Sequence, residues 1–268
     1  MVYFYAIHNS KLPFVLLILA IASAALAEPN AAAPAFEPGK EVRLNIGKTV
    51  GEILVYVPSD YNDDCNWPAI FYYHGKGGSL STGWLQIATG GKGFVIVSME
   101  FAPTTSERMN PTQYRAYVER EIKNLAFTRH FLQGRLKIDP KMTVLAGVSR
   151  GGWLVADIFS IRPQLAAAAV ITCAGFHNWL PQEALPLTKK YVYIGAGQTD
   201  QNLEPAKKAK RFFENRGADV TFEIYLGLGH EINPNAPKLQ KWFLDLRSNL
   251  TQPKTNRPPA NEPNEPNK

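Results

Sequence analysis

One stretch, residues 142–159, constrains the fold more than any other part of this 268-residue chain. An apolar run leads into the sequence GVSRG at residues 147–151, and an amphipathic segment follows. This pattern predicts a strand, a sharp turn and a helix, with Ser149 at the apex of the turn. Glycines are expected on both sides of the serine because side chains there would collide with the neighbouring strand and helix. The alternative is an ordinary strand-to-helix turn that happens to contain these residues, so partners for Ser149 must be sought elsewhere.

The rest of residues 41–250 alternates between short apolar runs and segments of helical periodicity. Strands are predicted at residues 42–46, 51–57, 68–73, 93–98, 142–146, 166–173, 191–195 and 220–226. Helices are predicted at residues 84–88, 111–132, 204–215 and 234–250, and directly after Ser149. Such alternation indicates an α/β fold with a mostly parallel sheet and helices on both faces. The first two strands, joined by a short turn, predict an antiparallel edge.

The N-terminus has the pattern of a secretion signal. Lys11 precedes the apolar residues 12–22, and Ala-Leu-Ala at residues 25–27 matches an A-x-A cleavage site. The alternative, an uncleaved anchor, is disfavoured because the apolar run is shorter than the roughly 20 residues of a membrane span. We therefore expect residues 1–27 to be removed and the protein to be exported to the periplasm or outside the cell, without stable membrane insertion.

Composition sets the limits of the folded part. Residues 28–40 are rich in Ala and Pro, and residues 251–268 repeat Pro, Asn, Glu and Lys, so we expect a disordered leader and a disordered tail. One domain of residues 41–250 lies between them. The net charge of +6 is not gathered into a basic stripe, and the densest basic group, residues 207–211, falls at helical spacing. No nucleic-acid partner is expected.

A serine nucleophile needs a base that takes its proton. Only two histidines follow Ser149 in the chain, His177 and His230. His230 directly follows Gly229 on a loop with two glycines just after a predicted strand, and it is the preferred base. His177 comes before the candidate acid and is instead expected to line the pocket.

The base in turn needs an acid to orient it. Asp200 follows the predicted strand 191–195, which is where ligand chemistry sits in a parallel sheet. Its alternative role is to cap the following helix, and the two roles are compatible. Asp157 and Glu204 are rival acids, but both fall on predicted helices and are expected to face elsewhere.

The developing oxyanion needs backbone N–H donors. One is expected from Arg150, directly after the serine. The other is expected from the glycine-rich loop HGKGG after the third strand, at Lys76 with Gly77 as the alternative. His74 of the same loop is expected to support the loop rather than to perform chemistry.

The motifs HGKGG, GVSRGG, the Asp200 loop and GHE, in this order, resemble those of the α/β-hydrolase superfamily. Within it, the chain is most similar to small secreted esterases of the dienelactone hydrolase, phospholipase/carboxylesterase and polyhydroxybutyrate-depolymerase-like groups. The resemblance implies an eight-stranded sheet and a triad of Ser149, Asp200 and His230. One departure is that dienelactone hydrolases usually carry a cysteine where Ser149 stands.

The two cysteines, Cys65 and Cys173, are expected to lie near opposite edges of the sheet and to remain unpaired. The five histidines are scattered without a close set of cysteines or carboxylates, so neither a metal site nor a cofactor is expected.

The connection between the sixth and seventh strands is short, which predicts a site without a large lid. Its apolar residues, Trp179 among them, are expected to form one wall of the pocket beside His177. These features predict a monomeric serine esterase for short acyl groups on aryl, carbohydrate or other bulky alcohols, acting on a small-molecule or polysaccharide-linked ester. The alternatives are a serine peptidase of the same superfamily and a non-catalytic binding protein on the same scaffold.

Overall fold

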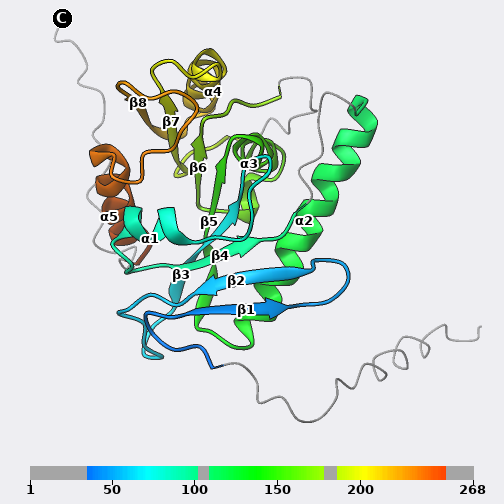
Figure 1. Cartoon of the computed structure of the whole chain (residues 1–268), viewed down its shortest axis with the longest axis vertical. Coiled ribbons are helices and arrows are strands. Elements are labelled where there is room, and N and C mark those ends of the chain that lie inside the picture. The colour runs from blue at the N-terminus through cyan, green and yellow to red at the C-terminus, as the bar shows by residue number, and fades with distance from the viewer. Residues whose placement is uncertain (1–34, 102–108, 178–185, 252–268) are drawn as a thin grey trace, which may run out of the picture. The chain divides into compact units, whose positions relative to one another are not determined.

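A computed structural model of the chain describes residues 35–101, 109–177 and 186–251. Its strands form one eight-stranded sheet in the order β1-β2-β4-β3-β5-β6-β7-β8 (Figure 1). β1 pairs with β2, and β2 with β4, in antiparallel fashion, whereas all the other pairs are parallel. The predicted mostly parallel sheet with an antiparallel edge is confirmed. The strands are β1 (Glu41–Asn45), β2 (Glu52–Tyr56), β3 (Trp67–Tyr73), β4 (Val95–Met99), β5 (Ile138–Val148), β6 (Ala168–Thr172), β7 (Tyr191–Gly197) and β8 (Asp219–Tyr225).

Helices cover both faces of the sheet, as predicted (Figure 1). Buried side chains of α2, α3 and α4 pack into one apolar cluster, and those of α1 and α5 pack into a second cluster. The helices are α1 (Gly83–Thr89), α2 (Pro111–Gln133), α3 (Arg150–Ile161), α4 (Leu203–Asn215) and α5 (Pro237–Thr251), with a short 3-10 turn at Pro163–Leu165.

Local sequence accounts for these elements. The central strands β3 and β4 are rich in aromatic and β-branched residues and have few polar ones, and every residue in both strands is buried. α2 begins where Asn110 and Gln113 form a reciprocal capping box, with a proline at the first helical position.

Residues 35–40, which the composition assigned to the leader, pack against the domain. Phe36 packs against the core, the Gly39 N–H donates to the Val57 carbonyl at 2.9 Å, and the Val57 N–H donates back to Lys40 at 3.0 Å. The expectation of a disordered leader is therefore wrong for residues 35–40, because these bonds fasten them to the end of β2. The predicted signal and the predicted tail beyond Thr251 lie outside the described residues. Across the described ranges, none of the helices combines the length and apolarity that a bilayer crossing needs.

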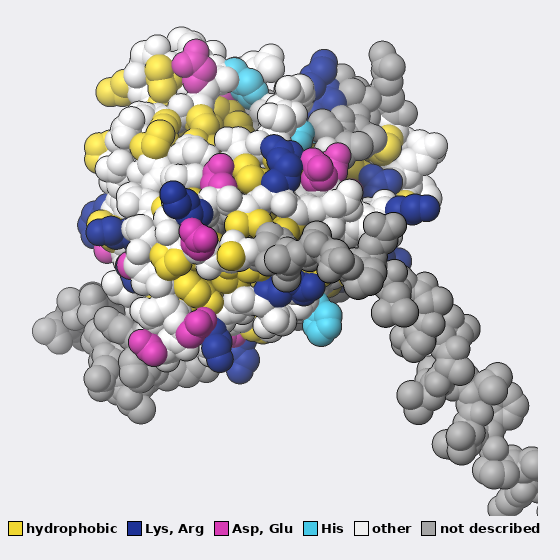
Figure 2. All heavy atoms as spheres, turned by 60° about the horizontal axis from the view of Figure 1, so that its bottom comes forward, with side chains coloured by type: hydrophobic (Ala, Val, Ile, Leu, Met, Phe, Trp, Pro, Cys, Tyr) yellow, Lys and Arg dark blue, Asp and Glu magenta, His cyan; other side chains and the backbone are white. Residues whose placement is uncertain are grey.

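The surface in Figure 2 has a mixed character. Lysine and arginine side chains are interspersed with acidic ones over this face, and apolar side chains gather near its centre. This face therefore carries no continuous area of one sign of charge.

Candidate active site

The turn between β5 and α3 places Ser149 in an unusual backbone conformation, with φ 54° and ψ −118°. A Cβ atom at Gly147 would lie 2.3 Å from the Gly151 carbonyl oxygen. One at Gly151 would lie 1.9 Å from the carbonyl oxygen of Tyr73 on β3. The expected collisions on both sides of the serine are thus confirmed. Only glycine at these two positions lets α3 start directly above the sheet.

The serine lies where the strand order reverses. β4, which follows β3 in the chain, pairs with one edge of β3, and β5 pairs with the other edge. Such a reversal leaves a crevice at the carboxyl ends of the strands. The loop after β3 closes on this point, since a Cβ atom at Gly75 would lie 3.3 Å from the Ser149 Cβ.

The structure brings Ser149, His230 and Asp200 together. His230 Nε2 lies 2.8 Å from Ser149 Oγ, and His230 Nδ1 lies 2.8 Å from Asp200 Oδ1. An ionised carboxylate only accepts hydrogen bonds, so Nδ1 carries the proton and Nε2 is left to accept the serine O–H. The Asp200 side chain is fully buried, while 38% of the His230 side chain is exposed. The acid is thus inaccessible and the base faces solvent.

The loop after β7 carries the acid, the loop after β8 carries the base, and contacts between these two loops set the distance between acid and base. A Cβ atom at Gly197, the last residue of β7, would lie 1.9 Å from the Gly229 carbonyl oxygen, so the histidine loop passes directly against this strand end. The Thr199 N–H donates to the Leu228 carbonyl at 3.0 Å. Asn202, and not Asp200, stands at the N-cap position of α4, where its side chain makes no capping bond, and the Asn202 N–H donates to Asp200 Oδ1 at 2.8 Å. Asp200 therefore does not cap α4. Its carboxylate accepts a hydrogen bond within the turn just before the helix.

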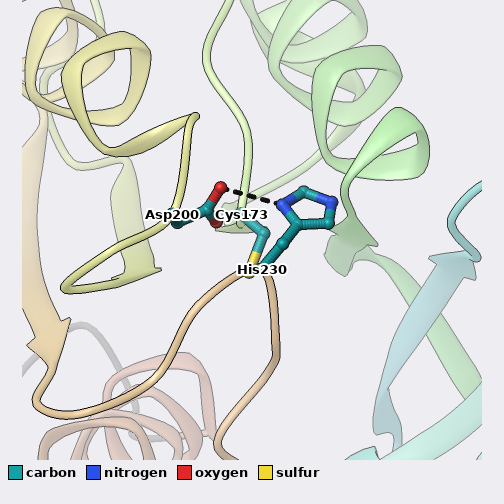
Figure 3. Close-up of side chains that lie close together, drawn as sticks. All are labelled: Cys173, Asp200 and His230. Carbon is teal, nitrogen blue, oxygen red and sulfur yellow. Dashed lines mark hydrogen bonds and ion pairs between the residues drawn. The ribbon is translucent and has the colours of Figure 1, made fainter.

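Cys173 joins this group. Cys173, Asp200 and His230 follow the adjacent strands β6, β7 and β8, and their polar atoms lie within 4.8 Å of one another (Figure 3). The sequence did not indicate this set, because the three residues come from three separate loops. Burial, followed by the neighbouring Asp200 carboxylate, raises the pKa of the Cys173 thiol, which therefore stays protonated at neutral pH. A metal held here would need the thiolate and would replace the Asp200–His230 hydrogen bond.

The expected oxyanion donors belong to the two loops that meet at the serine. Arg150 is the first residue of α3, and Lys76 and Gly77 belong to the loop after β3, where Gly77 has a φ of 72°. The His74 ring lies 2.7 Å through Nδ1 from the Gly75 carbonyl and packs on Phe101, in keeping with a supporting role.

His177 belongs to a different network. Its Nδ1 lies 2.6 Å from Asp157 Oδ2, and its backbone N–H donates to Asp157 Oδ1 at 2.9 Å. The Tyr114 hydroxyl donates to the same carboxylate at 2.7 Å, and the His177 ring lies 4.7 Å from that of Trp153. Asp157 is 1% exposed and pairs with His177 and not with His230, so it faces away from the triad, as expected, and toward the loop after β6. The signal for this pair was an acidic residue within the apolar face of α3.

Of the other candidates, Trp179 lies outside the described residues. Phe176 stacks on Phe212 of α4, with ring centroids 4.2 Å apart. Both cysteines are unpaired, Cys65 exposed and Cys173 buried, as expected.

Comparisons with known proteins agree with this architecture. No family model matches the sequence, and no curated protein matches it either. Solved structures do match. A carboxylesterase from Mesorhizobium loti aligns with a TM-score of 0.59 at 17% identity, over 80% of this chain and 99% of its own. A Bacillus cereus carboxylesterase aligns with a TM-score of 0.57 at 18% identity, over 67% and 89%, and an arylesterase with 0.58 at 15%, over 82% and 87%. Together with the parallel sheet and the serine turn after β5, these matches show that the chain has the α/β-hydrolase fold.

Proposed function

We propose that this protein is a serine hydrolase that cleaves carboxylic esters through an acyl-enzyme. The observation that carries the proposal is the pair of 2.8 Å hydrogen bonds that link Ser149 to His230 and His230 to Asp200. A serine within reach of a histidine that is itself oriented by a buried acid is the arrangement that makes a hydroxyl nucleophilic. The structural resemblance to carboxylesterases supports the choice of esters.

In the proposed first step, Ser149 Oγ attacks the ester carbonyl carbon while its proton passes to His230 Nε2. The carbonyl oxygen becomes an oxyanion and receives the backbone N–H groups of Lys76 and Arg150. The positive end of α3 adds to this stabilisation. The bond to the alcohol oxygen then breaks, and His230 returns its proton to the departing alcohol. An acyl group remains on Ser149.

In the second step, a water molecule attacks the acyl carbon and gives its proton to His230. The carboxylic acid product leaves as Ser149 regains a proton. Asp200 keeps its negative charge throughout, holding the imidazole in one tautomer and stabilising the imidazolium. Its complete burial suits this role because the charge has little competition from water.

For the substrate, we infer a short acyl group on a larger alcohol. The chain between β6 and β7 comprises only residues 173–190, too short a segment for a large helical lid. Without a lid, each further methylene of a long acyl chain forgoes about 0.8 kcal/mol of apolar burial. An open site still admits a bulky aryl or carbohydrate alcohol.

The primary test is labelling by a fluorophosphonate probe, with Ser248→Ala as the matched control because Ser248 is exposed on α5. Labelling of the wild type and the control, but not of Ser149→Ala, is expected. Ester turnover should fall by roughly 10⁴–10⁶ in Ser149→Ala and His230→Ala, and somewhat less in Asp200→Asn. A folded wild type that resists the probe would instead indicate a binding protein, and preferential cleavage of peptide substrates would indicate a peptidase.

The acyl preference has its own test. Specificity constants on p-nitrophenyl esters of increasing length should fall beyond about C4–C6, as expected of a pocket with limited apolar area. A continuous rise to long chains, or activation at a lipid interface, would contradict the inferred open site.

Export belongs to the same proposal. The A-x-A site predicts that the mature chain begins at Glu28. N-terminal sequencing of protein recovered from the periplasm or medium tests it, and a retained Met1 would exclude cleavage.

A further inference from the structure

The buried acid of the triad is only partly satisfied. Asp200 Oδ1 receives the Asn202 N–H and His230 Nδ1, both at 2.8 Å. Oδ2 is also buried, yet among the described residues no donor meets full hydrogen-bond geometry with it. A buried carboxylate oxygen without a donor is costly. We therefore expect a further polar group to donate a hydrogen bond to this oxygen.

The Cys173 thiol is placed to do so. It follows β6 at the same edge of the sheet, beside the Asp200 carboxylate (Figure 3). Cys173 has a φ of 53°, which non-glycine residues adopt only when their surroundings enforce it. Here its N–H donates to the Gly195 carbonyl at 2.8 Å, and its carbonyl accepts the Asn202 side-chain amide at 2.9 Å. Asn202 thus binds both the cysteine and the acid.

The thiol keeps its proton in this environment. Burial raises the pKa of the Cys173 thiol, and the negative charges of the neighbouring Asp200 and Glu231 carboxylates raise it further. The other ionisable groups that face it are His230 and the Tyr225 hydroxyl. Because the S–H is retained, it can donate to an oxygen, and Sγ lies 3.2 Å from the Glu231 carbonyl oxygen.

We propose that Cys173 is a positioning residue for the triad, whose S–H is shared between the Glu231 carbonyl and the buried Asp200 carboxylate and holds that carboxylate against His230. The proposal rests on the serine hydrolase function proposed above. It gives Oδ2 the donor that it otherwise lacks, and it explains why a strained backbone position carries a cysteine.

The sign of the effect follows from the charge. An S–H donor withdraws part of the negative charge from the carboxylate face that His230 contacts. Without that donor, the carboxylate stabilises the imidazolium more strongly, so the base stays protonated to a higher pH. The acid limb of kcat/KM should therefore move upward, by roughly half a pH unit. A less firmly held carboxylate should also lower kcat roughly fivefold, with little change in KM.

The kinetic test compares Cys173→Ala and Cys173→Ser on p-nitrophenyl acetate, with active sites counted by fluorophosphonate titration. Cys65→Ser is the control because Cys65 is exposed in the loop before β3. Cys173→Ala should show both changes, and Cys173→Ser should restore most of kcat because its hydroxyl also donates. A Cys173→Ala enzyme with wild-type kcat and acid limb, even if less stable, would show a packing role only. Serine performing no better than alanine would also overturn the proposal.

A second measurement needs no turnover. In Cys65→Ser protein the remaining thiol is Cys173, so its S–H stretching band in the infrared reports the hydrogen bond directly. The band should move to higher frequency in the Cys65→Ser/Asp200→Ala double variant. An unmoved band would mean that the thiol bonds the Glu231 carbonyl alone. If the wild type hydrolyses no ester but the band moves, the proposed function fails while the thiol–carboxylate contact stands.

Discussion

Single residues carry the strain of this site. Ser149 has a φ of 54°, and among the described non-glycine residues only Cys173 and Lys189 share its positive sign. Ser149 belongs to the candidate triad, and Cys173 lies beside it. Such conformations typically cost about 1–3 kcal/mol each and persist where function requires them. Because glycine tolerates them, Ser149→Gly should have a free energy of unfolding about 1 kcal/mol higher than Ser149→Ala.

Urea denaturation of the two inactive variants measures this difference. Ser248, exposed within α5, supplies a control of opposite sign. There the glycine variant should be less stable than the alanine variant by about 1 kcal/mol, because helices disfavour glycine. Equal stability of the two Ser149 variants would show that the turn stores no strain.

At the scale of elements, the contact of α3 with β3 depends on the absence of one side chain. A Cβ atom at Gly151 would lie 1.9 Å from a backbone oxygen of β3, which no rotamer change relieves. Gly151→Ala should therefore lower the free energy of unfolding by about 3 kcal/mol or more, or prevent folding. Overpacking by a side chain usually costs ~1–3 kcal/mol, and a clash with backbone costs more because whole elements must move. Gly83→Ala is the control. A Cβ atom at Gly83 would lie 3.8 Å from the nearest atom, and the φ of Gly83 is not in the left-handed region. Thermal unfolding of both variants provides the measurement, and a well-folded Gly151→Ala would contradict the packing of α3.

Helix α2 buries a carboxyl group that is poorly compensated. Glu121 is 2% exposed and contacts Arg120 and Asn124, yet burial outweighs both and raises its pKa. A raised folded-state pKa stabilises the fold below the unfolded pKa of about 4.3, and this contribution is lost as pH rises through the folded-state pKa. Glu121→Gln should therefore be more stable than the wild type at pH 8, on the order of 1 kcal/mol, with the gain vanishing near pH 4.

Denaturation of Glu121→Gln at several pH values tests the sign. Glu119→Gln on the same helix is the control, since Glu119 is 32% exposed and pairs with Arg162. It should give no gain and at most a small loss. The prediction would be contradicted if the free energy of unfolding of Glu121→Gln, minus that of the wild type, were smaller at pH 8 than at pH 4.

At this scale, the sequence predicts an element where neighbouring residues differ clearly in polarity or residue type. The serine turn was recognised because glycines, a serine and an apolar strand occur together. β5 was predicted too short, at residues 142–146 instead of Ile138–Val148. Its first half contains Asp139, Pro140 and Lys141, and its pairing with β3 is irregular there, so no apolar alternation marks it. The contacts of Cys173 with Asp200 and of His177 with Asp157 join distant segments, which no local pattern encodes.

At the scale of the whole described domain, one cluster joins the two ends of the fold. Arg247 on α5 donates to Asp60 Oδ2 at 2.8 Å, across 187 positions of the sequence. Asp60 Oδ1 accepts the Gly93 N–H at 2.9 Å, just before β4, and the Arg247 guanidinium lies 5.6 Å from the centroid of the Trp67 ring. The last helix is thus fastened to the loops that precede β3 and β4.

This cluster should contribute more than an ordinary surface ion pair. Arg247 and Asp60 are 37% and 29% exposed, and Asp60 is further held by a backbone donor, so less side-chain entropy is lost on pairing. A double-mutant cycle of Asp60→Ala and Arg247→Ala should give a coupling free energy of about 1 kcal/mol. Arg247→Lys should recover less than half of it, because lysine lacks the planar group that meets the carboxylate and the ring together. The exposed pair Lys241–Asp245 on the same helix, at 75% and 56%, is the matched control and should couple by only about 0.3–0.5 kcal/mol. Equal coupling in the two cycles would mean that α5 is held by apolar packing alone.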